Sequence, residues 1–518
     1  MTDTAHSGPV LAADGRPLKA SLNRALRRSK MRAMLLIAPL LLFITITFVV
    51  PIGQMLFRSV ENQIVSEVLP RTTQELASWD AETGVAPGAP VFSSLLKDMM
   101  VAVEKKQHTR LGSRLNYEMT GISSMFRKSG RKVDDLGEGY TDQFVALDPA
   151  WEDPAFWADL IEADAGAALP RTQEAYQSFA ATILSEDGDI AREEQPWHTV
   201  YLSLYEDLST APSADLSALP AQLTTAQGAV GGFEAEDLAA AFEDIDDDWV
   251  TVDTWQTIQT YSPAFTNGYF LNSVDRQKTP EGSQWRPEDQ QIYLTLFVRT
   301  LLMSLTITAS CILLGYPVAW LLANLPMRQA NLLMILVLLP FWTSLLVRTS
   351  AWKVLLQQQG VINEIVVWLG LVADDNRLAL INNATGTIIA MTHILLPFMI
   401  LPLYSVMKTI PPAYLRAAKS LGATNWTAFW RVYFPQSVPG IGAGSILVFI
   451  LSIGYYITPE IVGGTKGVFI SNRIAYHISS SLNWGLAAAL GAILLAVVLL
   501  LYWAYDRIVG IDNVKLGG

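Results

Sequence analysis

Long uncharged, apolar runs alternate with one extended polar stretch along this sequence. A helix that spans a membrane needs about 20 mostly apolar residues, and several runs between charged residues reach that length. A polar stretch, 57–296, separates the first run from the others. The pattern therefore predicts an all-α polytopic membrane protein with one large water-facing insert. The predicted spans lie near 33–56, 297–323, 330–350, 386–408, 441–460 and 484–505.

Charge follows the same division. Residues 57–296 hold 40 acidic and 16 basic residues, a net charge of −24, although the whole chain carries only −12. Apolar residues make up 51% of the chain and charged residues 16%, whereas roughly 25% of a soluble domain is charged. This composition excludes a single soluble globule, and the acidity argues against nucleic acid as a partner. Because Cys311 is the only cysteine, no intrachain disulfide is possible.

Basic residues beside the spans predict how the chain crosses the membrane. The tail 1–32 carries seven lysine and arginine residues, so we expect it to be cytoplasmic and to attract anionic membrane lipid. The following span, 33–56, is interpreted as an anchor rather than a signal peptide, because its apolar run is long and no clear cleavage site follows.

Alternation of the spans then gives each remaining segment a side. The insert 57–296 is predicted to be extracytoplasmic, or periplasmic. Residues 297–510 form the rest of the transmembrane domain, and their basic loop 409–440 is predicted to be cytoplasmic. The short tail 511–518 is cytoplasmic as well. The cytoplasmic segments are too small for an output domain, which disfavours the alternative that the protein is a membrane receptor or sensor with an extracytoplasmic ligand domain.

The insert has the composition of a folded domain. Apolar residues recur at helical spacing within 94–106, 173–184 and 235–245, so we expect one compact, mainly helical domain whose fold the pattern does not identify. An acidic run from Asp244 to Asp248 lacks the central glycine and closing glutamate of a calcium loop, and we interpret it as a solvated face. The aromatic residues expected in the core are Trp151, Phe156, Trp157, Trp197, Tyr201 and Tyr205.

The loop 409–440 carries the most informative local pattern. Pro411 and Pro412 can end one helix and begin another, because proline suits the first helical turn. A small apolar face then follows at Ala417, Ala418 and Leu421, and Gly422 can stop the helix in a left-handed turn. Such a short helix suits docking into a groove on another protein, but a plain surface helix between two spans explains it equally well.

The residues of this loop also resemble a known motif. The string 416–423, followed by Phe434-Pro435 and Val438-Pro439-Gly440, resembles the EAA loop of ABC importer permeases, which forms the coupling helix that contacts the ATPase subunit. Arg416 stands where that motif usually has glutamate, whereas the Ala-Ala-x-x-x-Gly spacing is kept. The resemblance assigns ATPase coupling to Arg416, Ala417, Ala418, Leu421, Gly422 and Ala423.

Three further segments narrow the resemblance to the spermidine/putrescine type of permease. They are 339–349, 396–404 and 455–464, and they resemble parts of the third, fourth and fifth spans of that family. The similarity covers roughly 30–58 and 290–510 and implies the six-helix ABC importer permease fold. Relatives in the family carry opines or aminophosphonates, which remain alternatives to a polyamine. The insert 57–296 is not part of the usual pattern.

The resemblance also implies a division of labour. The chain would be one of two permease subunits in a bacterial inner membrane, served by two ATPase subunits and an extracytoplasmic substrate-binding protein. The sequence has no phosphate-binding Gly-x-x-x-x-Gly-Lys-Ser/Thr loop, so we expect no enzymatic activity, no catalytic residues, and no cofactor or metal in this chain. ATP and Mg²⁺ would be bound by the partner ATPase.

Candidate substrate-pathway residues gather near the outer ends of the spans. An acid near the hydrocarbon, such as Glu460, is costly and marks a functional hypothesis, and nearby aromatic faces suit a cationic amine. Arg348 would instead suit a carboxylate or phosphonate. The alternative is that the aromatic residues form an interfacial belt and that Glu460 is simply outside. The candidates are Trp342, Arg348, Tyr455, Tyr456 and Glu460.

Two other features of the spans favour packing roles. His393 is interpreted as a neutral, hydrogen-bonded packing residue rather than a proton relay. The small residues Gly485, Ala489, Ala492 and Ala496 recur on one helix face and indicate close helix packing, with the partner permease as one candidate for the contact. A channel or secondary transporter that works alone would tend to carry ionisable residues inside several spans, and these spans have almost none.

Overall fold

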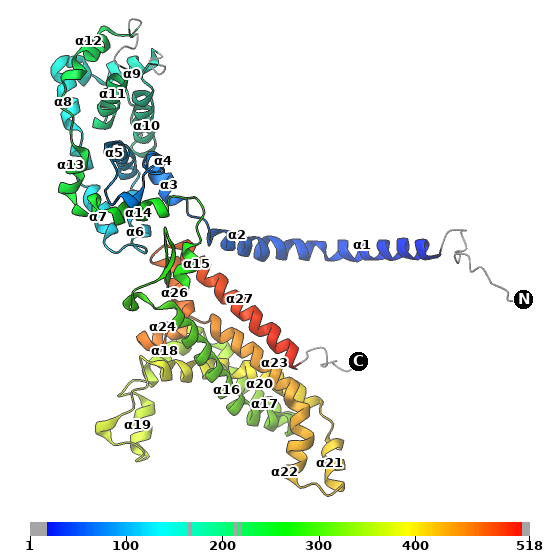
Figure 1. Ribbon diagram of the computed structural model, residues 1–518. Coiled ribbons are helices and arrows are strands. Elements are labelled where there is room, and N and C mark those ends of the chain that lie inside the picture. Colours follow the sequence, from blue (N-terminus) through cyan, green and yellow to red (C-terminus); the bar gives the residue numbers. More distant parts are fainter. Residues whose placement is uncertain (1–17, 164–167, 212–215, 217–218, 510–518) are drawn as a thin grey trace, which may run out of the picture. The chain divides into compact units, whose positions relative to one another are not determined.

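The computed structural model describes residues 18–163, 168–211, 216 and 219–509 (Figure 1). Most of the described chain is helical. Its only strands among the described residues are β1 (Arg276–Thr279) and β2 (Gly282–Trp285), which pair antiparallel. The predicted all-α polytopic class is therefore confirmed. Residues 1–17 of the predicted basic tail and the whole predicted tail 511–518 lie outside the described residues.

The chain divides after Ser59 into two units. The first unit is one continuous helical rod made of α1 (Leu18–Ile44), the π-helical turn η1 (Thr45–Val49) and α2 (Val50–Arg58). Its apolar stretch Ser29–Arg58 is long enough to cross a membrane. The hydroxyls of Thr45 and Thr47 donate to carbonyls four residues earlier, at 2.8 and 2.7 Å, so the rod satisfies its polar groups internally, as a bilayer requires.

The second unit begins at Val60 and contains the insert and the remaining membrane helices. Helices α16, α20 and α23 pack tightly along one another. Glycines allow this approach: a Cβ on Gly444 would lie 2.6 Å from Met399 Sδ, and one on Gly315 would lie 3.2 Å from Met399 Cγ. The long apolar helices are α16 (Tyr293–Asn324), α17 (Met327–Leu338), α18 (Leu345–Leu355), α20 (Ala384–Thr409), α23 (Phe434–Gly454) and α27 (Trp484–Val509).

The third predicted span, 330–350, is wrong as a single straight helix. Helix α17 continues through the short turn η9 (Leu339–Trp342), and α18 then starts at a bend of 95°. Pro340 lacks the amide hydrogen that a continuous helix needs, and the Ser344 side chain accepts from Val347 N at 3.2 Å to cap a new helix. The described chain thus has five long apolar helices and one bent pair.

The fifth predicted span, 441–460, is displaced. The helix already begins at Asn425 and runs as α22 (Asn425–Ala428), the π-helical turn η11 (Phe429–Tyr433) and α23. It passes through Pro435 and Pro439, because the wider turn at η11 precedes them and Pro435 falls in the first turn of α23. It ends at Gly454, so Glu460 belongs to a separate short helix, α24 (Ile457–Val462).

Short helices lie in the connections between these spans. One of them, α21 (Pro412–Ser420), occupies the predicted cytoplasmic loop. The others are α19 (Val361–Trp368), α25 (Gly464–Gly467) and α26 (Ile470–Ser479), together with the 3₁₀ turn η10 (Asp374–Asn376).

The insert is helical, as predicted, and forms one apolar core of its own. The expected helices correspond to α5 (Ala89–Glu104), α10 (Pro170–Glu186) and α13 (Leu238–Ile245). Trp151, Trp157 and Tyr201 are fully buried. The acidic run from Asp244 to Asp248 takes part in contacts within the insert. Asp246 accepts from Asp248 N and pairs with Lys128 Nζ at 2.7 Å. The helices are α3 (Ile64–Val68), α4 (Pro70–Leu76), α5 (Ala89–Glu104), α6 (His108–Leu115), α7 (Ile122–Ser129), α8 (Glu138–Leu147), α9 (Pro154–Glu162), α10 (Pro170–Glu186), α11 (His198–Thr210), α12 (Ala221–Ala229), α13 (Leu238–Ile245), α14 (Val252–Thr260) and α15 (Gly268–Ser273).

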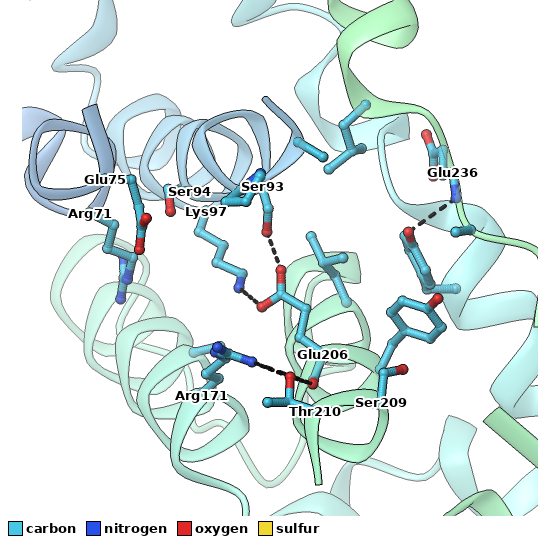
Figure 2. Close-up of a pocket in the computed structure, with 18 of the residues that line it drawn as sticks. Arg71, Glu75, Ser93, Ser94, Lys97, Arg171, Glu206, Ser209, Thr210 and Glu236 are labelled. Atoms are coloured by element: carbon cyan, nitrogen blue, oxygen red, sulfur yellow. Dashed lines mark hydrogen bonds and ion pairs between the residues drawn. The ribbon is translucent and has the colours of Figure 1, made fainter. Parts of the chain in front are cut away.

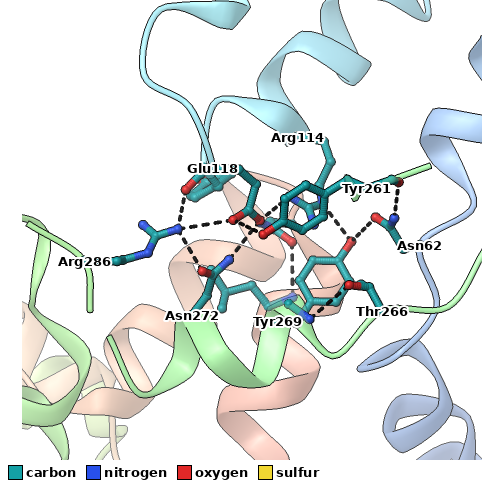
Figure 3. Close-up of polar contacts among 12 residues, drawn as sticks. Asn62, Arg114, Glu118, Tyr261, Thr266, Tyr269, Asn272 and Arg286 are labelled. Carbon is teal, nitrogen blue, oxygen red and sulfur yellow. Dashed lines mark hydrogen bonds and ion pairs between the residues drawn. The ribbon is translucent and has the colours of Figure 1, made fainter. Parts of the chain in front are cut away.

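A buried polar network closes the end of the insert nearest the membrane helices (Figure 3). Its centre is the Glu118 carboxylate, which pairs with Arg114 Nη1 at 2.7 Å and accepts from Tyr261 Oη at 2.8 Å and Asn272 Nδ2 at 2.9 Å. Arg286 lies 3.5 Å from the same carboxylate and donates to Asn272 Oδ1 at 2.8 Å. The network therefore links α6, α14, α15 and the segment that leads into α16.

The same junction fixes the start of the membrane domain. Asp275 caps α16, because its carboxylate accepts from Ile292 N, Tyr293 N and Leu294 N at 2.8–3.0 Å. Gly485 lets α27 approach α15, since a Cβ there would lie 2.4 Å from the Tyr269 ring. The predicted packing role of the small-residue face is thus observed at Gly485, with the insert rather than another span as its neighbour.

His477 connects the network to α26. Its Nε2 lies 3.0 Å from Tyr293 Oη and its Nδ1 lies 2.8 Å from Ser481 Oγ, and the ring is buried. Burial, with the nearby Arg473 charge, lowers the pKa of His477 to about 4 from its ordinary 6.5. Stability from the neutral ring is therefore complete above pH 6.5 and is lost as the pH falls towards 4.

We expect acid to weaken this junction through His477. At about pH 5 the loss should be about 2 kcal/mol, because one pKa unit corresponds to about 1.4 kcal/mol. The measurement is the thermal unfolding midpoint of the purified protein between about pH 7.5 and about pH 5. His477→Gln should flatten this dependence, whereas Tyr293→Phe, which keeps the imidazole, should retain it. The prediction is wrong if the wild type and His477→Gln show the same dependence on pH.

Candidate functional site

Helix α21 projects from the end of the helix bundle between α20 and α22 (Figure 1). Pro411 and Pro412 start it, as expected from the sequence. Leu415 is partly buried against the membrane-domain core, and α21 also contacts the turn η11. The opposite side is open, because Arg416, Ala417 and Lys419 are exposed. The bundle therefore presents this helix as a short, supported knob.

The predicted stop at Gly422 is confirmed. Its φ of +87° is left-handed, and Gly422 N donates to Lys419 O at 3.0 Å while Ala423 N donates to Ala418 O at 3.1 Å. These two bonds satisfy carbonyls that the helix end would otherwise leave open. Nothing lies within 4 Å of a Cβ placed on Gly422, so only the backbone conformation requires glycine here.

An apolar surface surrounds the end of α21. Leu421 is 90% exposed and Trp426 is 71% exposed, which is unusual for side chains of this size outside a lipid-facing span. Beside them lies an open groove of about 480 Å³. Its lining residues are Tyr414, Ala417, Ala418, Leu421, Val432 and Gln436. Leu421 and this groove offer a partner both a protruding and a receiving apolar element.

Arg348 lies at the other end of the bundle, on α18. Its Nε is buried and has no hydrogen-bond partner among the described residues. Its charge acts on both His393 of α20 and Tyr455 beyond α23, so these three groups share one region. His393 Nδ1 accepts from Trp352 Nε1 at 3.1 Å, a contact that suits the predicted packing role.

Tyr456 and Glu460 are held together by a residue that the sequence analysis missed. Asn472 Nδ2 donates to Tyr456 O at 2.9 Å and to Glu460 Oε2 at 2.6 Å, and Glu460 N donates to Tyr456 O at 3.0 Å. The Glu460 side chain remains exposed. Trp342 is 72% exposed on η9 and, within the described chain, forms no hydrogen bond or ring contact with the other candidates. The structure thus groups Arg348 with Tyr455 and groups Tyr456 with Glu460.

The described residues contain no cluster of three or more His, Cys, Asp or Glu side chains arranged for a metal ion. Asn472 carries no charge and lies outside every predicted span, so no signal in the sequence distinguished it from an ordinary loop residue.

Comparison with known proteins adds to this geometry. Residues 297–509 match the family described as "Binding-protein-dependent transport system inner membrane component". The spermidine/putrescine transport system permease protein PotB of Escherichia coli is 36% identical over 220 residues, which are 42% of this chain and 79% of PotB. The inner membrane ABC transporter permease protein YdcU of Escherichia coli is 32% identical over 227 residues, or 42% of this chain and 71% of YdcU.

The chain belongs to this family of ABC transporter permeases. It is accordingly a multi-pass inner-membrane permease, and its relatives are permeases rather than enzymes. Among solved structures, one similar chain comes from a bacterial alginate ABC transporter crystallised with its alginate pentasaccharide-bound periplasmic protein. The similarity covers 44% of the present chain and 84% of the transporter chain, at 19% identity and a TM-score of 0.34. The family match begins at residue 297, so it leaves out the insert.

We expect Gly422→Ala to loosen the end of α21. A left-handed conformation costs an L-residue roughly 1–2 kcal/mol, which corresponds to about 5- to 30-fold faster exchange of the Leu421 and Ala423 amides. Hydrogen–deuterium exchange of the purified permease measures this. Gly454→Ala is the matched control, because a Cβ there also meets nothing within 4 Å but its φ is not positive. Unchanged exchange in Gly422→Ala would contradict the assignment of strain.

Proposed function

We propose that the permease is one of two transmembrane subunits of an ATP-driven importer of small cationic amines, with the polyamines spermidine and putrescine as the first candidates. The 36% identity to PotB over 79% of its length is the observation that carries this proposal. A second permease subunit, two ATPase subunits that bind ATP and Mg²⁺, and an extracytoplasmic substrate-binding protein would complete the importer.

In this proposal, both termini and α21 are cytoplasmic and the insert 57–296 is extracytoplasmic. The surface made by Ala417, Ala418 and Leu421 would then contact an ATPase. Burying one exposed leucine contributes about 1.5–3 kcal/mol, so Leu421 alone could supply much of the apolar contact. Because Arg416 replaces the usual glutamate, shape and apolar area would matter more here than an acidic contact.

Transport would follow from movement of this knob. Closure of the two ATPase subunits on ATP would displace α21, and its attachment through η11 and Leu415 would pass the displacement to α20 and α23. Such a switch is a rigid-body change between outward and inward access, biased by the ligand that each state prefers. No covalent chemistry is required in the permease itself.

The outer contacts are consistent with amine recognition. The exposed Glu460 carboxylate sits one helical turn from Tyr456, and an ammonium group is attracted by both a carboxylate and an aromatic face. Trp342 and Tyr455 would contribute further aromatic faces to the pathway. The insert would lie on the side where a substrate-binding protein delivers its cargo, as a contact for that protein or as a cover over the outer opening.

Arg348 supports a second candidate class of substrate. Its buried Nε without a partner among the described residues would suit a carboxylate or phosphonate, as in opines or aminophosphonates. Arg348→Gln separates the two classes: it should abolish uptake of an anionic substrate, whereas uptake of a polycation should persist or increase because a repelling charge is removed.

Leu421→Asp should weaken ATPase association. A charged side chain at this exposed position cannot be buried without a large desolvation cost, so we expect at least a tenfold decrease in the ATPase that co-purifies with the tagged permease. Val85→Asp is the matched control, because Val85 is also an exposed apolar residue but lies in the insert. Equal co-purification of the wild type and Leu421→Asp would remove Leu421 from the docking surface.

Glu460→Gln should impair amine transport. Loss of the carboxylate charge should raise the substrate concentration for half-maximal uptake at least tenfold, because charge-assisted contacts contribute about 1.5–3 kcal/mol. Uptake of labelled spermidine by reconstituted importer measures this. Asp375→Asn neutralises another exposed outer acid and should have no effect. If both variants transport like the wild type, Glu460 does not line the pathway.

A further inference from the structure

The insert contains two copies of the same sequence pattern. Leu-Pro-Arg-Thr occurs at 69–72 and again at 169–172. Val-x-x-Ser-Leu-x-x-Asp follows at 91–98 and again at 200–207. Each copy ends on Phe-x₃-Asp-x₂-Trp-x₅-Trp, which runs over 144–157 and 242–255. Three motifs recurring in the same order indicate an internal repeat.

The two copies also make the same contacts. Thr72 donates to Asp98 Oδ2 from both its amide and its hydroxyl at 2.8 Å, and Thr172 donates to Asp207 Oδ2 in the same way at the same distance.

The tryptophan pairs repeat as well. Trp157 Nε1 donates to Trp151 O at 2.9 Å, and Trp255 Nε1 donates to Trp249 O at 2.6 Å. Matching polar contacts at matching positions show that the described residues of 69–162 and 169–260 are two copies of one structural unit, here called repeat 1 and repeat 2.

The copies exchange their second halves. The tryptophan segment of repeat 1 packs against repeat 2, where the Trp157 and Tyr201 rings are 4.9 Å apart. The segment of repeat 2 packs against repeat 1, where the Trp255 and Phe92 rings are 5.1 Å apart. The result is two lobes: lobe A consists of α3–α7 with α13 and α14, and lobe B consists of α8–α12 (Figure 1).

Two crossing segments connect the lobes, one leading into α8 and the other into α13. The segment before α13 is bonded to α8 itself: Glu234 N donates to Gln143 Oε1 at 2.7 Å, Gln143 Nε2 donates to Glu234 O at 3.1 Å, and Glu236 N donates to Tyr140 Oη at 3.1 Å. Two lobes joined by a pair of crossing segments form an architecture that can close around a ligand by hinge motion.

A cleft of about 760 Å³ lies between the lobes (Figure 2). Equivalent positions of the two repeats meet across it: Lys97 of α5 and Glu206 of α11, each one residue before the repeated aspartate, pair at 2.6 Å. Arg71 of α4 crosses the same gap to Glu174 of α10 at 2.8 Å. The cleft therefore lies on the approximate two-fold axis of the repeats, and ion pairs hold it in the observed state.

The charges that remain in the cleft are mainly negative. Arg71 and Lys97 are paired by the contacts above, and Arg171 donates to Thr210 Oγ1 at 2.9 Å. Among the described residues, no ion pair is formed by Glu75, Glu236 or Asp237. Of the basic residues that line the cleft, only Arg171 forms no ion pair within the described chain. The cleft therefore holds three unpaired acids and one unpaired base. The cleft also lies in an insert whose net charge is −24, which attracts cations over several ångströms.

One edge of the cleft combines an acid with aromatic rings. Tyr140 and Tyr205 lie with ring centroids 4.9 Å apart, and Glu236, in the segment before α13, lines the cleft and donates from its backbone N to Tyr140 Oη. Glu236 Oε2 is buried and has no hydrogen-bond partner within the described part of the chain. A buried acceptor without a donor costs free energy, and an ammonium group would supply the donor while its charge meets the ring faces.

We propose that this interlobe cleft binds a cationic aliphatic amine, with Glu236 as the ion-pair partner and Tyr140 and Tyr205 as the aromatic wall. This site lies in the insert, outside the membrane pathway, and its argument does not rest on the proposed transport function. The ligand would join lobe A, lobe B and the crossing segments, so that binding favours the closed arrangement of the two lobes.

The test is isothermal titration calorimetry of the full-length permease in lipid nanodiscs at about 0.15 M salt, where diffuse attraction is screened. The probes are 1,4-diaminobutane and spermidine, with 1,4-butanediol as a neutral molecule of the same length and glutarate as an anion. We expect saturable binding of the amines only. Glu236→Gln should weaken it at least tenfold, and Tyr205→Leu should weaken it about fivefold.

Repeat 1 supplies the matched control. Glu138 occupies the position in repeat 1 that Glu236 occupies in repeat 2, but it is exposed and does not line the cleft. Glu138→Gln removes the same charge and should bind amines like the wild type. The proposal is overturned if the wild type binds no amine, if glutarate or butanediol binds equally well, or if Glu236→Gln and Glu138→Gln behave alike. Uptake assays are separate, so these outcomes leave the transport proposal standing.

Discussion

A single buried carboxylate, that of Glu118, fixes the end of the insert from which the chain continues into the membrane helix α16. Two arginines, a tyrosine and an asparagine converge on it from four segments of the chain. Such an arrangement adds little net stability compared with apolar packing, but removal of one partner would leave charge buried without compensation, at a cost of about 3–5 kcal/mol. The network thus works mainly as a constraint on geometry, because only one arrangement of α6, α15 and the segment before α16 satisfies all of its members.

This constraint has consequences along the membrane helices. Asp275 follows the network residue Asn272 closely in the sequence and caps α16. Helix α16 in turn packs along α20 and α23. Those two helices lead directly to α21, with its exposed leucine. The insert and α21 are therefore joined by continuous packed helices rather than by flexible linkers. The glycines facing Met399 make this packing close, so a displacement at one end cannot be absorbed by empty space.

The sequence predicted some of these features well and others poorly, for physical reasons. Apolar run length revealed the spans, and the proline and glycine signals revealed both ends of α21, because these features depend on local chemistry. The bend after Pro340 and the break after Gly454 fall inside apolar runs, where length and hydropathy do not change. Contacts such as Asn472 with Glu460 join residues from different elements and leave no local pattern. The internal repeat of the insert could have been found from the sequence, because its three motifs recur there. Such scattered identities become visible only when the insert is aligned with itself.

The exchange of halves between the two lobes has an evolutionary consequence. Neither repeat contains a complete lobe, since each lobe takes its tryptophan segment from the other copy. A single ancestral copy would therefore have left its apolar face open, and it would have been completed by a second identical chain around a true two-fold axis. Fusion of the two genes would then have turned a symmetric homodimer into one polypeptide and freed its halves to diverge, as Lys97 and Glu206 have done at equivalent positions.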